Sequence, residues 1–140
     1  LQACPEVSDS GMAALALSLP RTLQKLELNL RSSSIGDTGL ASLAQSLPRH
    51  LGELVLDLSG CIRITDKGVA ALTVGMPQTL RRLDVSLEGC FDVRDGCISL
   101  MRRGLPPSLQ HLSLNVLATS VAQESQKRRY TLADVRAWQP

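Results

Sequence analysis

The residues from 35 to 48 show the hydrophobic spacing of a helix with one buried side. Leu40, Leu43 and Leu47 stand at positions i, i+3 and i+7, which places them on one helical stripe. Asp37 precedes them, where a carboxylate can accept a hydrogen bond from a free amide of the first turn. Pro48 cannot continue a helix. We therefore predict a helix that is capped by Asp37 and ends at Pro48.

A second period, of two residues, follows the proline. Leu54, Leu56 and Leu58 alternate with Val55 and Asp57. Successive side chains of a strand point to opposite faces, so this alternation is typical of a strand with one buried face. We therefore expect a short strand directly after each helix.

The same pattern of helix and strand occurs four times. The units start near residues 7, 35, 64 and 93, so the steps between them are 28, 29 and 29 residues. A fixed period of this size is typical of a solenoid, in which each unit buries its apolar face against its neighbours. The aspartate and the proline recur as Asp9, Asp37, Asp66 and Asp95, and as Pro20, Pro48, Pro77 and Pro106. The other apolar strand positions are Leu26, Leu28, Leu30, Leu83, Val85, Leu87, Leu112, Leu114 and Val116.

The connection between strands fixes how they pair. Because each strand returns after one helix, the connection is a crossover and the strands run parallel. Helices are about twice as wide as the ~4.8 Å strand spacing, so the stack bends with the sheet on its inner face. The sequence therefore predicts an α/β solenoid with a curved parallel sheet.

A longer motif resembles a known family. The stretch "LDLSGCIRITDKGVAAL" is similar to the cysteine-containing, ribonuclease-inhibitor-like subtype of leucine-rich repeat. The resembling positions are Leu56, Leu58, Cys61, Ile64, Thr65, Asp66, Gly68 and Val69. The resemblance covers roughly residues 1–120 and implies a right-handed βα superhelix of four 28–29-residue units with a concave sheet. Two departures are Glu53, where the family has leucine, and Cys97, which replaces the glycine of Gly11, Gly39 and Gly68.

Both ends depart from the repeat. Residues 1–6 align with the end of a strand and its following turn, with Leu1 as the last strand residue, so we interpret the chain as a piece of a longer protein or a shortened gene product. Residues 121–140 contain a polar turn and then a predicted capping helix. That helix has Thr131 as its cap and Leu132, Val135 and Trp138 on one side. A basic contact through Lys127, Arg128 and Arg129 is the alternative, although three charges are few for it.

Composition changes the picture only slightly. The net charge is +2, charged residues make up 20% and aromatic residues 2%. Bulk charge therefore predicts neither nucleic acid nor membrane as a partner, and no apolar run approaches the ~18 residues of a membrane span.

No pattern of catalytic chemistry is present in the sequence. There is no acid pair at catalytic spacing, no phosphate-binding glycine loop and no metal signature, so we expect no enzyme, cofactor or metal site. His50 is expected in solvent on a connecting turn, and His111 beside the inner face of the last strand.

The cysteines fall into one structural column. Cys4, Cys61 and Cys90 occupy equivalent places, and no closely spaced pair suits a metal. The resemblance implies reduced thiols that bond to backbone in a cytoplasmic, or nuclear, protein. A disulfide between Cys61 and Cys90 stays open, because a cysteine count alone does not decide it.

The inner face is the candidate binding surface. Its outward strand residues form rows across the units, and the middle rows carry acidic side chains without a basic one. The expected partner-binding residues are Glu27, Asn29, Val55, Asp57, Asp84, Ser86, Glu88, Ser113 and Asn115. We expect a monomeric interaction module whose protein partner presents Lys or Arg. The alternatives are a ubiquitin-ligase substrate receptor (whose F-box segment the sequence lacks), a regulator like ribonuclease-inhibitor repeats, and a structural spacer or capping fragment.

Overall fold

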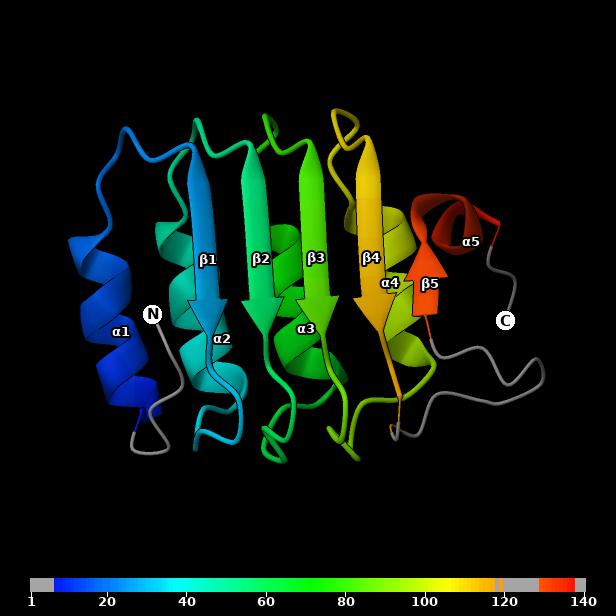
Figure 1. Ribbon diagram of the computed structural model, residues 1–140, viewed down its shortest axis with the longest axis horizontal. Coiled ribbons are helices and arrows are strands. Elements are labelled where there is room, and N and C mark those ends of the chain that lie inside the picture. The colour runs from blue at the N-terminus through cyan, green and yellow to red at the C-terminus, as the bar shows by residue number, and fades with distance from the viewer. Residues whose placement is uncertain (1–6, 118, 120–128, 138–140) are drawn as a thin grey trace.

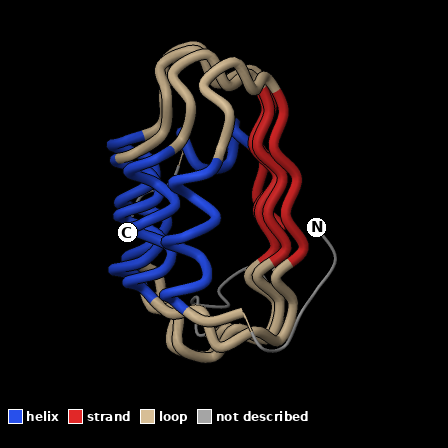
Figure 2. The backbone as a smooth tube through the Cα atoms, turned by 90° about the vertical axis from the view of Figure 1, so that its left-hand side faces the viewer, coloured by secondary structure: helices blue, strands red, loops and turns tan. Residues whose placement is uncertain are grey.

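The repeats form two layers, with a sheet on one side and helices on the other (Figures 1 and 2). The computed structural model describes residues 7–117, 119 and 129–137. The helices are α1 (Asp9–Ser18), α2 (Asp37–Ser46), α3 (Asp66–Val74), α4 (Gly96–Gly104) and α5 (Leu132–Arg136). The strands are β1 (Lys25–Asn29), β2 (Glu53–Asp57), β3 (Arg82–Ser86), β4 (His111–Asn115) and β5 (Arg129–Thr131).

The sheet has the predicted parallel order. Strands β1 to β4 pair in sequence order, and Leu28, Leu56, Val85 and Leu114 lie opposite one another in register. These side chains are buried, because they point from the sheet into the helical layer. The prediction of an α/β solenoid is confirmed. The short strand β5, which pairs antiparallel with β4, was not predicted.

The helices begin and end where local chemistry requires. Helix α2 buries the predicted stripe of Leu40, Leu43 and Leu47, and it ends at Ser46, two residues before Pro48. A residue before proline avoids the helical conformation, which explains the extended backbone of the cap residue Leu47. The repeated prolines therefore turn each helix toward the next strand.

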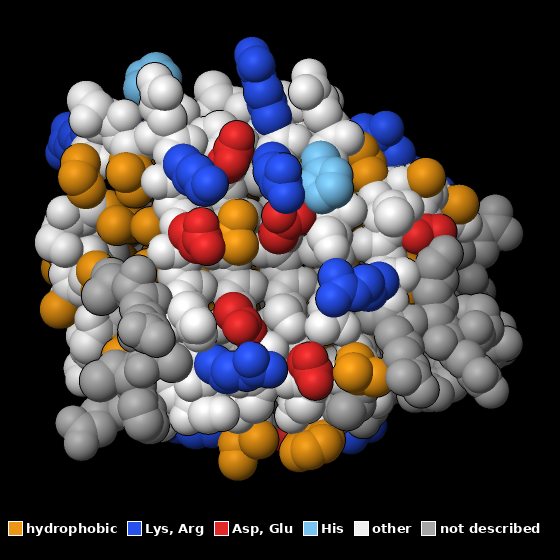
Figure 3. Space-filling model, in the orientation of Figure 1, with side chains coloured by type: hydrophobic (Ala, Val, Ile, Leu, Met, Phe, Trp, Pro, Cys, Tyr) orange, Lys and Arg blue, Asp and Glu red, His pale blue; other side chains and the backbone are white. Residues whose placement is uncertain are grey.

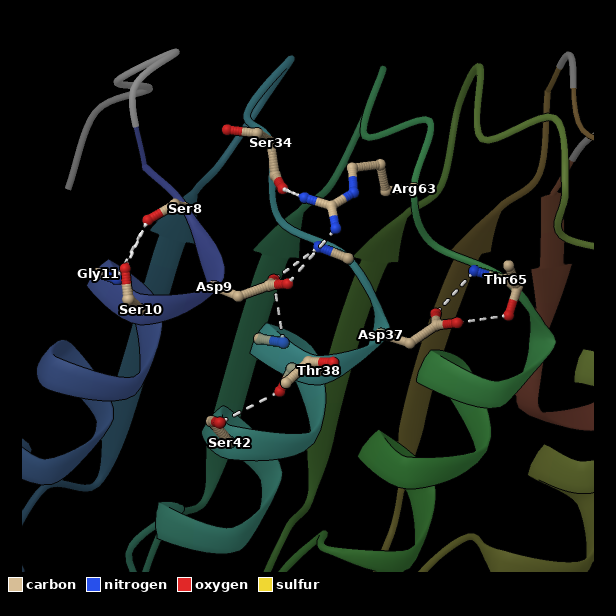
Figure 4. A network of polar contacts seen from close by, with 12 residues as sticks. Ser8, Asp9, Ser10, Gly11, Ser34, Asp37, Thr38, Ser42, Arg63 and Thr65 are labelled. Carbon is tan, nitrogen blue, oxygen red and sulfur yellow. Dashed lines mark hydrogen bonds and ion pairs between the residues drawn. The ribbon is translucent and has the colours of Figure 1, made fainter.

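The aspartates do not cap their own helices as predicted. Asp9 is the first residue of α1, and its Oδ1 accepts hydrogen bonds from the backbone N–H groups of Gly36 at 2.8 Å and Gly39 at 3.0 Å (Figure 4). Those amides belong to the start of α2, whose cap residue Gly36 has no side chain to satisfy them. Arg63 also reaches back to Asp9, with 4.0 Å between charged atoms. The carboxylate of one unit thus caps the helix of the next.

The same cross-unit bond recurs along the stack. Asp37 accepts from the backbone N–H of Thr65 at 2.8 Å and from its hydroxyl at 2.6 Å. Asp66 accepts from the N–H of Arg94 at 2.7 Å. Asp95 is the cap residue of α4, but its side chain makes no cap bond, which corrects the prediction there as well. The aspartate column therefore joins units.

The glycine column makes room for these carboxylates. A Cβ on Gly39 would lie 2.4 Å from Asp9 Oδ1, and a Cβ on Gly68 would lie 2.4 Å from Asp37 Oδ1. In the fourth unit Gly96, one residue before Cys97, takes this place against Asp66. Cys97 can therefore occupy the glycine column as a fully buried core side chain.

Removal of one such carboxylate should destabilise the array. We expect Asp37→Ala to lower the free energy of unfolding by about 1–3 kcal/mol, because the two part-buried donors of Thr65 lose their acceptor. Asp37→Asn keeps a side-chain carbonyl and should lose less. Urea unfolding monitored by circular dichroism measures both. Asp92→Ala, at an exposed aspartate, is the control, and an equal effect there would contradict the cross-unit role.

The C-terminal helix begins with a complete capping box. Thr131 Oγ1 accepts from the N–H of Asp134, while the Asp134 carboxylate accepts from the N–H of Thr131 at 2.7 Å. Val135 is buried, and so is Tyr130 in β5. The expectations for residues 1–6 with Leu1 and Cys4, for Lys127 and Arg128, and for Trp138 lie outside the described residues.

Candidate binding surface

The outward strand residues lie in continuous rows on the outer face of the sheet, here called the concave face, which is turned toward the viewer in Figure 3. The parallel register places Glu27, Val55, Asp84 and Ser113 side by side in one row. A second row holds Asn29, Asp57, Ser86 and Asn115. Apart from Glu27, which is exposed, all are half-buried. The structure therefore brings the expected residues of these two rows together.

Part of the second row shapes the turns after the strands. The side-chain oxygens of Asn29, Asp57 and Asn115 each accept from the backbone N–H two residues later, at 3.2, 3.0 and 3.1 Å. This is the Asx-turn geometry, in which a short polar side chain imitates a backbone turn. These three residues thus have a structural role that the sequence analysis missed, although the recurring Asn or Asp was visible.

Neighbouring polar groups extend this arrangement. The Ser59 hydroxyl donates to Asp57 at 2.5 Å and lies 2.9 Å from the Ser86 hydroxyl. The Asn115 amide donates to Ser86 at 3.3 Å and to Glu88 at 3.5 Å. Residues Ser86 and Glu88 of the expected site are therefore held by bonds between units.

Basic side chains of an adjoining row reach the acidic row. The carboxylate of Asp84 lies 3.0 Å from Arg82 and 3.1 Å from His111. Glu27 contacts Lys25 more loosely, at 3.9 Å. The surface is therefore less acidic than we expected from the sequence, because basic side chains at the first residues of the strands pair with its carboxylates.

A shallow hollow of about 420 Å³ lies over β2, β3 and β4 on this face. Val55, Asp84 and Ser113 line it together with Arg129 from β5. Among the described residues, no side-chain hydrogen bond engages Ser113, and Asp57 keeps its Oδ2 atom open. These groups, with the exposed Glu27, are the ones most available to a partner.

The described cysteines are buried thiols. Cys61 Sγ donates to the carbonyl of Leu30 at 3.1 Å, and Cys90 Sγ donates to that of Leu58 at 3.2 Å. Both are free, as is Cys97, so the structure favours the reduced form over a disulfide between Cys61 and Cys90. Burial raises the pKa of Cys90 to about 12 and also raises that of Cys61 and Cys97. Such thiols are poor nucleophiles near neutral pH.

Thiol reactivity tests this arrangement. At pH 8 a thiol with a pKa near 12 is ionised in about one molecule in ten thousand, so Cys90 should react slowly with iodoacetamide in the native protein. In concentrated urea the pKa returns toward its ordinary value and the reaction should become fast. Peptide mapping by mass spectrometry separates Cys61, Cys90 and Cys97. Fast native labelling of Cys90, or a bridge between Cys61 and Cys90, would contradict the structure.

The described residues form neither a metal-binding cluster nor a membrane-spanning helix. No three His, Cys, Asp or Glu side chains gather closely enough to hold a metal ion. No helix in this part of the chain is long and apolar enough to cross a membrane. His50 is exposed on its turn and His111 lies at the start of β4, as expected.

Comparison with known families agrees with the architecture. A family model described as "Leucine Rich repeat" matches residues 22–44 and 54–72. The first segment runs from just before β1 into α2, and the second runs from β2 into α3. The two matches support the leucine-rich repeat family, and the fold is an α/β repeat solenoid of the kind that this family forms. The ribonuclease-inhibitor-like subtype stays a prediction. The search of curated proteins finds no match for this chain.

Proposed function

We propose that this chain is a non-catalytic module that binds a protein partner through its concave sheet. Leucine-rich repeat domains generally mediate protein–protein interaction. The observation that carries the proposal is the continuous row of Glu27, Val55, Asp84 and Ser113, of which the last three line a hollow of about 420 Å³. Parallel strands in register hold these side chains rigidly, which reduces the entropy that binding costs.

The partner should present a Lys or Arg side chain to this surface. Glu27 has a side chain that is 65% exposed, and its ion pair with Lys25 is long, at 3.9 Å. Asp57 offers its open Oδ2 atom beside the hollow. The exposed carboxylate of Glu27 and the half-buried one of Asp57 would attract a basic group of the partner. This attraction would speed association and fix the orientation of the partner on the sheet. Binding should therefore weaken as ionic strength rises.

Charge substitutions within the row test the proposal. We expect the double variant Val55→Arg, Ser113→Arg to lose partners that the native chain captures from a cell lysate, since both changes add repulsion and bulk. Quantitative mass spectrometry of the captured proteins measures the loss, expected to be about tenfold or more.

A matched control separates this effect from added charge. The double variant Ala14→Arg, Val74→Arg adds the same two charges on exposed helix positions. It should keep the partners of the native chain. If the row variant also keeps them, the concave-face proposal is wrong and a structural spacer becomes the better interpretation.

A further inference from the structure

The upper rim of the solenoid carries an excess of positive charge. We define this rim as the segments that lead from each helix end to the following strand, which lie along the upper edge in Figure 1. They comprise residues 19–25, 47–53, 75–82 and 105–111. Their cationic side chains are Arg21, Lys25, Arg49, Arg81 and Arg82, and the carboxylate in these segments is that of Glu53.

Three of these cations have no carboxylate partner. Arg21, Arg49 and Arg81 are exposed, and none of them pairs with a carboxylate in the described part of the chain. By contrast, Lys25 lies 3.9 Å from Glu53, and Arg82 is held by its bond to the concave face. The rim thus presents guanidinium groups that the fold itself does not use.

Helix ends do not cancel this charge. The C-termini of α1 to α4 lie at the rim, and each contributes a partial negative charge of about one half. Together these amount to about two negative charges, against five cations and one carboxylate. The upper rim therefore stays net positive.

The rim is also hollowed. Two adjoining hollows, of about 600 and 700 Å³, share His50 as a lining residue. The first lies between the ends of α1 and α2 and includes Leu17, Arg21 and Arg49. Leu17 is 84% exposed, so this hollow has an apolar wall beside its arginines. The second crosses the strand starts and includes Arg81.

His50 departs from a structural pattern where the hollows meet. In the next two units the equivalent residues, Thr79 and Ser108, donate hydroxyl hydrogen bonds back to the preceding unit, at 2.8 Å to Arg49 O and 2.7 Å to Leu80 O. His50 makes no such bond among the described residues. Beside the two hollows, backbone bonds from Gly52 and Glu53 to Gln24 therefore join the first two units without the side-chain bond seen in the later units.

We propose that the upper rim binds an extended acidic peptide segment of a partner protein. Arginine matches carboxylates in a bidentate geometry, and three unpaired guanidinium groups line the edge. A nucleic acid fits less well, because the rim segments contain no Phe, Tyr or Trp, the large aromatic side chains on which successive bases stack. This surface is distinct from the concave row, so the proposal does not rest on the function proposed above.

A labelled peptide tests the proposal directly. Four strands at ~4.8 Å spacing span about 14 Å, which an extended peptide crosses in about five residues, so a glutamate-rich probe of about eight residues suffices. Fluorescence anisotropy should show that the probe binds the native chain and that binding weakens as salt is added. The variant Arg49→Glu, Arg81→Glu should weaken binding about tenfold or more.

Three comparisons make the outcome decisive. The variant Arg31→Glu, Lys67→Glu changes net charge equally at exposed positions outside the rim, and it should bind like the native chain. The concave variant Val55→Arg, Ser113→Arg should not weaken binding of the acidic probe, which separates this proposal from the first. No binding at low salt, equal losses in both charge-reversal variants, or tighter binding of an oligothymidylate of matched length would each overturn the proposal.

Discussion

Leu56→Asp should abolish cooperative folding of the repeat array. Leu56 is 1% exposed at the centre of β2, so its replacement removes about 1.5–3 kcal/mol of burial. The new carboxylate would lose its water without gaining a partner, which costs several kcal/mol more. A domain of this size is stable by about 5–15 kcal/mol, so the sum takes most or all of it. Thermal melting followed by circular dichroism should show no native transition.

The preceding residue in the strand, Val55, provides the matched control. Val55 points to the concave face and is half-buried, so Val55→Asp places the same carboxylate where water reaches it. Repulsion from Glu27 and Asp84 on the neighbouring strands costs roughly 0.2–1 kcal/mol, so that variant should melt only a few degrees below the native chain. Equal melting temperatures for the native chain and Leu56→Asp would show that the assigned strand register is wrong.

Gly75→Ala should produce the largest loss of stability from a single methyl group. A Cβ at Gly75 would lie 2.6 Å from both the Cβ and the carbonyl oxygen of Ala44, and 2.7 Å from its carbonyl carbon. Because two of these atoms are backbone, helix α2 itself has to move. Overpacking of this kind costs about 1–3 kcal/mol, which corresponds to a melting temperature lowered by about 3–10 °C.

Two further variants identify the cause. Gly52→Ala places its Cβ no closer than 3.5 Å to a neighbouring atom, the carbonyl oxygen of Gln24, and should be nearly neutral. Adding Ala44→Gly to Gly75→Ala removes the side-chain clash but leaves the clash with the backbone. It should therefore restore stability only in part. Full rescue, or a neutral Gly75→Ala, would contradict the close approach of α2 and α3.

The strands were predictable because their signal is local. Alternating leucines fixed which residues face the core, and the constant period fixed the register between Leu28, Leu56, Val85 and Leu114. Strand β5 gave no such signal, since it has three residues and buries only Tyr130. Periodicity needs several residues to be visible, so short closing elements escape it.

The aspartates show what a repeat pattern leaves open. The column from Asp9 to Asp66 was visible, but its partners lie 27 to 30 residues away, in the next unit. Within one unit, the first free amides of the helix are equally plausible donors, so spacing alone selected the wrong ones. The candidate binding surface was likewise predictable only in part. Alternation identified the outward residues, whereas the Asx turns and the pairing of Asp84 depend on contacts between side chains.

The cross-unit aspartate bonds bear on how such a protein can change length during evolution. The second and third units each supply a carboxylate at one side and receive one at the other, as in the bonds that Gly36 donates to Asp9 and that Thr65 donates to Asp37. A duplicated segment of whole-unit length would therefore arrive with both halves of every junction already matched. An insertion of a few residues within the helix start would instead separate donor from acceptor. Gene duplication in steps of one repeat is thus the change that these junctions tolerate best.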